Sequence, residues 1–147
     1  MKNRMMKKAI IYLSLLLMMA TACKKYEEGP LISLRTKEKR LCQTWNLEEV
    51  SKNGVAVDDH DIKYKWKFHK DGDFTLYQSE QNYDGVWETV EHPSRWNWVD
   101  NQEQIEIEAF NQSYYWIHYD IIKLKYDELI LELTLEENLY RYVLRTE

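Results

Sequence analysis

The stretch Ile62-Lys-Tyr-Lys-Trp-Lys-Phe-His69 alternates apolar and polar side chains at every position. Because successive side chains of an extended strand point to opposite faces, this period of two predicts a half-buried strand with its lysines in water. The segment Lys70-Asp-Gly-Asp73 follows as a hairpin turn, in which Gly72 takes the positive φ that other residues resist. The alternating residues 74–78 then return as the partner strand.

The same period of two continues along most of the chain, with short polar turns at 100–103 and 126–128. About eight or nine strands joined by such short connections favour an antiparallel meander. Closing into a barrel buries the apolar faces and removes the exposed edges. We therefore predict an all-β fold, a small antiparallel up-and-down barrel of about eight strands, with an open β-sandwich of the same strands as the alternative. The other alternating segments are 45–47, 86–90, 95–99, 105–108, 114–124, 129–136 and 140–145.

The N-terminal segment has the pattern of a secretory signal. Its first eight residues carry four basic side chains and no acid, and an apolar run follows at 9–20. That run is too short for the ~20 residues of a membrane-spanning helix, so it indicates a signal peptide. Ala20-Thr-Ala22 before Cys23 resembles a lipobox, at which bacterial signal peptidase cuts before an acylated cysteine. We expect a signal peptide at 1–22, a lipid anchor on Cys23 with a flexible tether over 23–32, and the barrel domain at 33–147.

Two features are expected between the lipid and the first strand. Glu27 and Glu28 are similar to the acidic surface-export signal of Bacteroidota lipoproteins, and a plain solvated linker is the alternative. Residues 33–42 lack Gly and Pro and are rich in helix formers. They predict one or two helical turns, capped by Ser33 or Thr36, against the end of the following domain.

The run Leu41-Cys-Gln-Thr-Trp-Asn-Leu-Glu48 resembles the opening of lipocalin-like lipoproteins of Bacteroidota, in which Gly-Thr-Trp follows a short helix. Gln43 stands where that family has glycine. Segments 67–74, 95–107 and 122–132 are similar to the family's hairpins. The resemblance covers residues 31–147 and implies a lipocalin-like barrel, lipid-anchored at the cell outer membrane on the periplasmic side or the cell surface. Most members of the family lack an assigned function, so the resemblance implies a fold and a location rather than an activity.

Charge and cysteine content exclude some classes of partner. Without residues 1–22 the chain has 16 basic and 25 acidic residues, a net charge of −9. This acidic balance argues against nucleic acid and against electrostatic attraction to anionic lipid, so the membrane contact is expected from the acyl chains. If Cys23 is acylated, Cys42 has no disulfide partner, and we expect it to pack as a small apolar residue.

No motif in the sequence indicates catalysis. Asp58-Asp-His-Asp61 is the densest group of metal-ligand types, but it lacks the spacing of a calcium loop and is interpreted as solvated. His69, His92 and His118 are scattered, and His92 is expected in a turn before Pro93. We therefore expect no enzyme, no cofactor and no metal site.

The aromatic residues are the most informative for function, because they make up 14% of the chain and gather on faces predicted to point inward. They suit a pocket for a small apolar molecule, but an eight-stranded barrel is narrow enough to be filled by its own side chains. The two hypotheses are an envelope lipoprotein that binds a small apolar ligand, and a non-enzymatic interaction or structural module with a filled barrel. In the second, the outer aromatics Tyr77, Trp87 and Tyr115 would contact an envelope protein. The candidate ligand-binding residues are Trp45, Tyr64, Trp66, Trp96 and Trp98.

Overall fold

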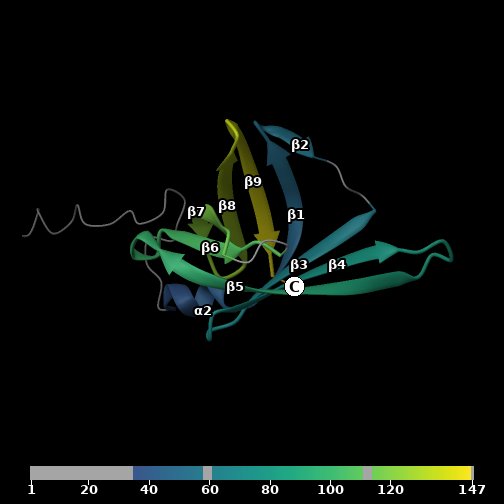
Figure 1. Ribbon diagram of the computed structural model, residues 1–147, viewed down its shortest axis with the longest axis horizontal. Helices are drawn as coiled ribbons and strands as arrows, with labels where there is room; N and C mark the ends of the chain where they lie inside the picture. The colour runs from purple at the N-terminus through teal and green to yellow at the C-terminus, as the bar shows by residue number, and fades with distance from the viewer. Residues whose placement is uncertain (1–34, 58–60, 111–113, 147) are drawn as a thin grey trace, which may run out of the picture.

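The computed structural model describes residues 35–57, 61–110 and 114–146 (Figure 1). The predictions for the signal peptide, Cys23 and the tether lie outside these residues. Within them the chain forms one short α-helix, one 3₁₀ turn and nine antiparallel strands. They are α2 (Lys37–Leu41), β1 (Thr44–Lys52), β2 (Val55–Val57), β3 (Ile62–Phe68), β4 (Asp73–Gln81), β5 (Trp87–Val99), η1 (Asp100–Gln102), β6 (Gln104–Glu108), β7 (Trp116–Leu124), β8 (Glu128–Leu135) and β9 (Asn138–Arg145).

Eight of these strands close into a barrel. Each strand from β3 to β9 pairs with the next along the chain, and β1 pairs with both β3 and β9. Leu47 lies opposite Leu144 where the last strand meets the first. The short β2 folds back on β1 outside this ring of strands. The predicted all-β meander barrel is therefore confirmed, and the open sandwich is not formed.

The helix α2 lies across one end of the barrel, which we call the closed end. Thr36 caps it by accepting a hydrogen bond from the backbone N–H of Lys39 at 3.2 Å. Lys37 Nζ donates to the carbonyl of Gln102 in η1, at 2.9 Å. The buried Arg40 donates through Nη1 to the carbonyl of Leu124, also at 2.9 Å. These contacts join the helix to the turns at the ends of β5 and β7.

Gln43 has a structural role at the position where the resembled family has glycine. Its Nε2 donates to the carbonyl of Arg40 at 2.7 Å and to the carbonyl of Tyr126 at 2.8 Å. One side chain thus connects the end of α2 to the turn between β7 and β8. The amide satisfies two carbonyls that lack partners in a helix or strand, as buried or half-buried polar groups require.

The predicted hairpin turn at 70–73 is confirmed. Gly72 has φ of +92°, and its carbonyl accepts a hydrogen bond from the backbone N–H of Trp96 at 2.8 Å. A Cβ on Gly72 would lie 3.4 Å from the carbonyl oxygen of Trp96. Both the backbone angle and this close approach to β5 favour glycine here.

The prediction that His92 lies in a turn is wrong, because His92 and Pro93 lie inside the long strand β5. Thr75 of β4 is opposite Pro93, but the pairing of β5 with β6 begins only at Trp96, opposite Ile107. Proline lacks a backbone N–H and is tolerated in a strand where one side has no ladder to complete. The missing partner at this position of β5 explains how the strand continues through Pro93.

The barrel is closed at one end and splayed at the other. β1 and β3 pair only over three positions, from Thr44 opposite Lys67 to Asn46 opposite Lys65. Beyond Asn46, β1 pairs with β9 and β2. In the same region β3 stays paired with β4, which in turn pairs with β5. Figure 1 shows β1, β2, β8 and β9 rising together while β3, β4 and β5 run off to the side. We call this splayed end, with the β1–β2, β4–β5, β6–β7 and β8–β9 connections, the open end.

Candidate functional site

Three aromatic rings from strands far apart in the sequence meet in the middle of the barrel. Trp66 of β3 lies 5.8 Å from Tyr119 of β7 and 5.6 Å from Tyr142 of β9, measured between ring centroids. The two tyrosine rings are 5.8 Å apart. The Trp66–Tyr119 and Tyr119–Tyr142 pairs are edge to face, an arrangement that aromatic quadrupoles favour. We call these three residues the aromatic floor.

Below the aromatic floor, toward the closed end, the barrel is filled. Phe68 contacts Phe74 and Trp96, with ring centroids 4.9 and 5.5 Å apart. Trp96 donates its indole N–H to the carbonyl of His69 at 2.8 Å. Cys42 packs at the edge of this core, as predicted. The closed end is therefore a conventional apolar core. Its fully enclosed apolar side chains are Leu41, Trp45, Ile105, Leu124, Leu129, Leu131 and Leu144.

A small apolar cavity lies beside the floor, with a volume of about 40 Å³. That volume holds a single water-sized molecule, well below the ~300 Å³ at which ligand pockets begin. Phe110, near the start of the β6–β7 connection, forms part of its wall. The Phe110 ring lies 6.3 Å from Phe74 and 5.6 Å from His92. The cavity is lined by Trp66, Phe74, Leu76, Ile107, Glu108, Ala109, Phe110, Ile117 and Tyr119.

The hydroxyl of Tyr119 is a polar group within this apolar surrounding. Tyr119 is only 7% exposed, and its side chain forms part of the cavity wall. Burial raises the pKa of the Tyr119 hydroxyl, and the neighbouring Tyr142 raises it further. Burial likewise raises the pKa of Tyr142. Both hydroxyls therefore keep their protons at neutral pH, and that of Tyr119, which lines the cavity, can donate a hydrogen bond to a polar group that enters it.

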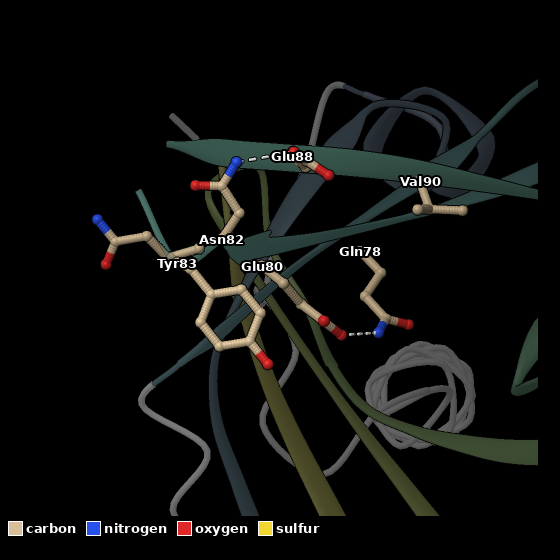
Figure 2. A pocket seen from close by; sticks show the side chains of 7 residues that line it. Gln78, Glu80, Asn82, Tyr83, Glu88 and Val90 are labelled. Carbon is tan, nitrogen blue, oxygen red and sulfur yellow. Dashed lines mark hydrogen bonds between the residues drawn. The ribbon is translucent and has the colours of Figure 1, made fainter. Parts of the chain in front are cut away.

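The inner face changes from apolar to polar between the floor and the open end. Along β4, Leu76 lies opposite Trp66, Gln78 opposite Tyr64, and Glu80 opposite Ile62. A hollow of about 500 Å³ occupies this outer part of the inner face. Figure 2 shows its side chains gathered on one side of the β4–β5 hairpin, with the Tyr83 ring at the hairpin tip. The hollow is lined by Gln78, Glu80, Gln81, Asn82, Tyr83, Glu88 and Val90.

Two carboxylates of the hollow lie directly opposite each other, Glu80 on β4 and Glu88 on β5. Like charges in this position repel. Each carboxylate accepts a hydrogen bond from a neighbouring amide: Gln78 donates to Glu80, and Asn82 donates to Glu88 at 2.8 Å (Figure 2). The outer part of the inner face is thus polar and acidic, in contrast to the floor.

The structure separates the five candidate ligand-binding residues by depth. Trp66 is in the floor, and Tyr64 is half-buried one step farther out on the same face of β3. Trp45 and Trp96 belong to the filled closed end, and Trp98 packs on Trp96 with ring centroids 5.3 Å apart. The candidate set therefore divides into two residues near the cavity and three below it.

Sequence reasoning did not select several residues of the site. Tyr119 and Tyr142 complete the floor, and Gln78 and Glu80 begin the hollow. Strand alternation places all four on inward faces, as it does for many other residues. What the sequence lacks is a signal for which inward residues of distant strands meet.

Metal-ligand residue types do not converge in the described part of the chain, where no three His, Cys, Asp or Glu side chains are grouped as a metal site. Residues 58–60 of the Asp58–Asp61 cluster lie outside the described ranges. His118 lies on the outer surface, with Nδ1 3.7 Å from Glu106 Oε2. Among the described helices, none has the length and apolar character needed to cross a membrane.

The barrel is similar to solved lipocalins. Japanin from Rhipicephalus appendiculatus, in its complex with cholesterol, matches with a TM-score of 0.57 and 14% identity over 76% of this chain and 79% of japanin. The bovine lipocalin allergen Bos d 2 matches with a TM-score of 0.47 and 6% identity over 76% of each chain. Bovine odorant-binding protein, solved with a selenium-containing odorant, matches with a TM-score of 0.46 and 11% identity over 80% of this chain and 77% of that protein.

The fold and the closed ring of eight strands define the class of this protein as a lipocalin-like barrel. At 14% identity, the likeness to japanin shows the fold alone. No protein-family model matches the sequence, and no curated protein is significantly similar to it.

Proposed function

We propose that this chain is a non-enzymatic, lipid-anchored lipoprotein of the cell envelope whose lipocalin-like barrel binds a small apolar ligand bearing one polar group. The observation that carries the proposal is the change from apolar to polar side chains along the inner face of the barrel. An aromatic floor and apolar cavity lie at the centre, and a polar hollow of about 500 Å³ lies outside them. Pockets of that volume, part apolar and part polar, are typical of small-molecule sites.

The volumes of the apolar cavity and of the polar hollow indicate how deep in the barrel the ligand lies. The closed end is filled, and a cavity of about 40 Å³ is too small for an organic ligand. The ligand therefore lies above the floor, with its apolar part against Leu76 and Ile117. Its polar group is placed either at the Tyr119 hydroxyl or outward at Gln78. Binding there buries apolar surface, which is favourable.

The likeness to japanin supports an apolar ligand, because japanin was solved with cholesterol bound. The sterol belongs to that protein, and the proposal for this chain is the broader class of small apolar molecules. The graded interior of the barrel is compatible with that class, since it offers apolar contacts at depth and hydrogen-bonding groups near the open end.

The proposed location rests on the N-terminal sequence. A short basic segment, an apolar run and Ala20-Thr-Ala22 before Cys23 support export and acylation of that cysteine. Together with the resemblance to lipoproteins of Bacteroidota, this supports anchoring at the outer membrane, on its periplasmic side or at the cell surface. Several acyl chains are enough for stable anchoring where one is not.

Photo-cross-linking tests the binding site in the membrane-bound chain. The probe is a long-chain alcohol that carries a diazirine, and the labelled peptides are identified by mass spectrometry. We expect labelling of peptides containing Leu76, Ile117 or Tyr142, competed by unlabelled alcohol. Ile117→Trp fills the space above the floor and should reduce this labelling by about tenfold. Leu139→Trp, on the exposed face of β9, is the matched control and should keep it. Absence of label from inward-facing peptides of a folded chain would refute the binding site.

The second hypothesis, an interaction or structural module, is supported by different residues. Trp87 and Tyr115 are exposed, while Tyr77 is half-buried on the outer face of β4. Exposed aromatic side chains are enriched where proteins make contacts. The cross-linking experiment separates the two hypotheses, because a module of this kind leaves the inward-facing peptides unlabelled.

A further inference from the structure

The exposed large apolar side chains are concentrated at one end of the molecule. Among the described residues there are twelve, and eleven of them lie on or beside the connections of the open end. The exception, Tyr126, lies at the closed end between β7 and β8. We call the eleven the open rim: Val55, Val57, Tyr83, Val86, Trp87, Val90, Phe110, Tyr114, Tyr115, Leu135 and Leu139.

The open rim consists of separate projections rather than one flat face. The β1–β2, β4–β5, β6–β7 and β8–β9 connections each contribute at least two of its residues. Figure 1 shows the β4–β5 hairpin directed away from the group formed by β1, β2, β8 and β9. A rigid protein partner would need a matching set of depressions. A lipid bilayer accommodates separate apolar tips without any such match.

The residue types of the open rim fit the headgroup region of a bilayer. Tyr83, Trp87, Tyr114 and Tyr115 combine an apolar ring with a polar group, and such side chains are enriched at membrane interfaces. Lys63 lies over the Trp87 ring, with Nζ 4.0 Å from its centroid. This places an ammonium beside the indole, where a long basic side chain can reach toward the headgroups while its stem stays apolar.

The charged residues near the open rim favour a zwitterionic bilayer over an anionic one. The bases Lys52 and Lys63 are outnumbered by acids at the same tips: Glu80, Asp84, Glu88, Glu136 and Glu137. Anionic lipids attract clusters of basic residues and repel an acidic surface. A zwitterionic bilayer carries no net charge, so the acids do not oppose an approach driven by the aromatic and aliphatic tips.

The length of the chain before the helix allows the open rim to reach the same membrane as the proposed lipid. Arg35 is at the closed end, where its guanidinium lies 4.2 Å from the centroid of the Tyr126 ring. Cys23 is twelve residues earlier, and twelve residues span at most ~40 Å. The nine residues of β1 measure only ~30 Å from the closed toward the open end. The connecting segment is thus long enough to pass along the barrel.

We propose that the open rim docks on a zwitterionic bilayer, so that the polar hollow and the aromatic floor open toward lipid. This inference goes beyond the proposed function and rests on it only for the anchor at Cys23. It gives an apolar ligand a path between bilayer and barrel that does not cross water.

Depth-dependent fluorescence quenching tests the docking in the acylated chain, reconstituted in phosphatidylcholine vesicles. A nitrobenzoxadiazole label is attached at Tyr83→Cys on the rim or at Tyr126→Cys at the closed end, both with Cys42→Ala. The two positions are exposed tyrosines at opposite ends of one barrel, so each controls for the other. Doxyl-labelled lipids should quench the label at 83 at least threefold more strongly than the label at 126. Trp87→Ser should halve the quenching at 83, and Leu47→Val, inside the barrel, should leave it unchanged.

The outcomes separate docking from anchoring. A chain that sediments with the vesicles but leaves both labels in water would overturn the docking and retain the anchor. A chain whose label at 126 is the more strongly quenched would overturn it too, because the closed end would then face the lipid. A chain that stays in the supernatant would overturn the anchor and the docking together.

Discussion

The indole N–H of Trp45 donates a hydrogen bond to the backbone carbonyl of Leu41 at 2.9 Å, and neither side chain has any exposed surface. The contact joins the last residue of α2 to the first strand of the barrel. The same carbonyl also accepts a hydrogen bond from the backbone N–H of Gln43 at 2.8 Å, so two donors converge on this end of the helix. Trp45 is therefore one of the buried contacts that hold α2 against the closed end of the barrel.

Replacing Trp45 tests this structural role. Trp45→Phe removes the hydrogen bond and part of the ring volume, and it leaves the carbonyl of Leu41 with the backbone N–H of Gln43 as its remaining donor. The free energy of unfolding should fall by about 2–3 kcal/mol, as measured by urea denaturation. Trp87→Phe at the exposed rim is the matched control and should change stability by less than about 0.5 kcal/mol. Equal losses in the two variants would contradict the prediction.

Phe110 limits the size of the apolar cavity. Phe110→Ala removes a half-exposed ring from the cavity wall and opens the space above Phe74 and His92. Affinity for a small apolar fluorescent probe should rise severalfold, while the unfolding free energy should change by about 1 kcal/mol or less because the ring is partly exposed. Tyr114→Ala, on the same connection but away from the cavity lining, is the control. A lowered affinity would show that Phe110 contacts the ligand instead of restricting it.

The buried hydroxyl of Tyr119 should make stability depend on alkaline pH. The raised pKa means that the folded state keeps a proton that the unfolded state releases above its ordinary pKa of 10.0. Above that pH the unfolded state binds fewer protons, so the free energy of unfolding falls as pH rises. Tyr119→Phe should flatten this decline and at pH 7 should be neutral or stabilising by up to ~1 kcal/mol. Tyr83→Phe, at the exposed tip, should keep the decline; denaturation between about pH 9 and 11 checks both.

Cys42 should be chemically unreactive in the folded protein. Burial raises the pKa of its thiol from 9.0 to about 11, with a smaller contribution from Glu38. The higher pKa lowers the thiolate fraction at pH 8 by a factor on the order of 100, and the thiolate is the reactive form. Iodoacetamide alkylation, quantified on the Cys42 peptide, should therefore be slower by at least that factor in the native chain than in urea. Similar alkylation rates in the native chain and in urea would refute the burial of the Cys42 thiol. As with Tyr119, the raised pKa of the thiol contributes a loss of stability as pH rises above 9.

Local patterns predicted much of the fold because their causes are local. The alternation in 62–69 and the turn at 70–73 depend on neighbouring residues, and both are present as predicted. The exception is His92-Pro93. A proline in a chain of strands is most often found in a turn, but here it lies in β5 because β6 has not yet begun to pair there. Where β6 begins to pair with β5 depends on the register of β6, which the residues around Pro93 do not determine.

Alternation also predicted which face of each strand is buried, but not the depth of a residue within the barrel. Trp45, Trp66 and Trp96 all point inward, as their parity indicates, yet only Trp66 lies next to the cavity. Irregularities between Leu47 and Glu49 and between Ile121 and Lys123 shift the register of β1 and β7. A single extra residue reverses the faces that follow it, and no local pattern predicts its position.

The sequence by itself determined the strands, most of the turns and the inward faces, because each follows from the conformational preferences of adjacent residues. Only the tertiary structure decided that Trp66 meets Tyr119 and Tyr142, which lie 53 and 76 positions later in the chain. It also decided that β1 leaves β3 after Asn46, which opens one end and brings the apolar tips to it. Both depend on how the ring of eight strands closes, and closure is set by hydrogen-bond register summed over all strands rather than by any one of them.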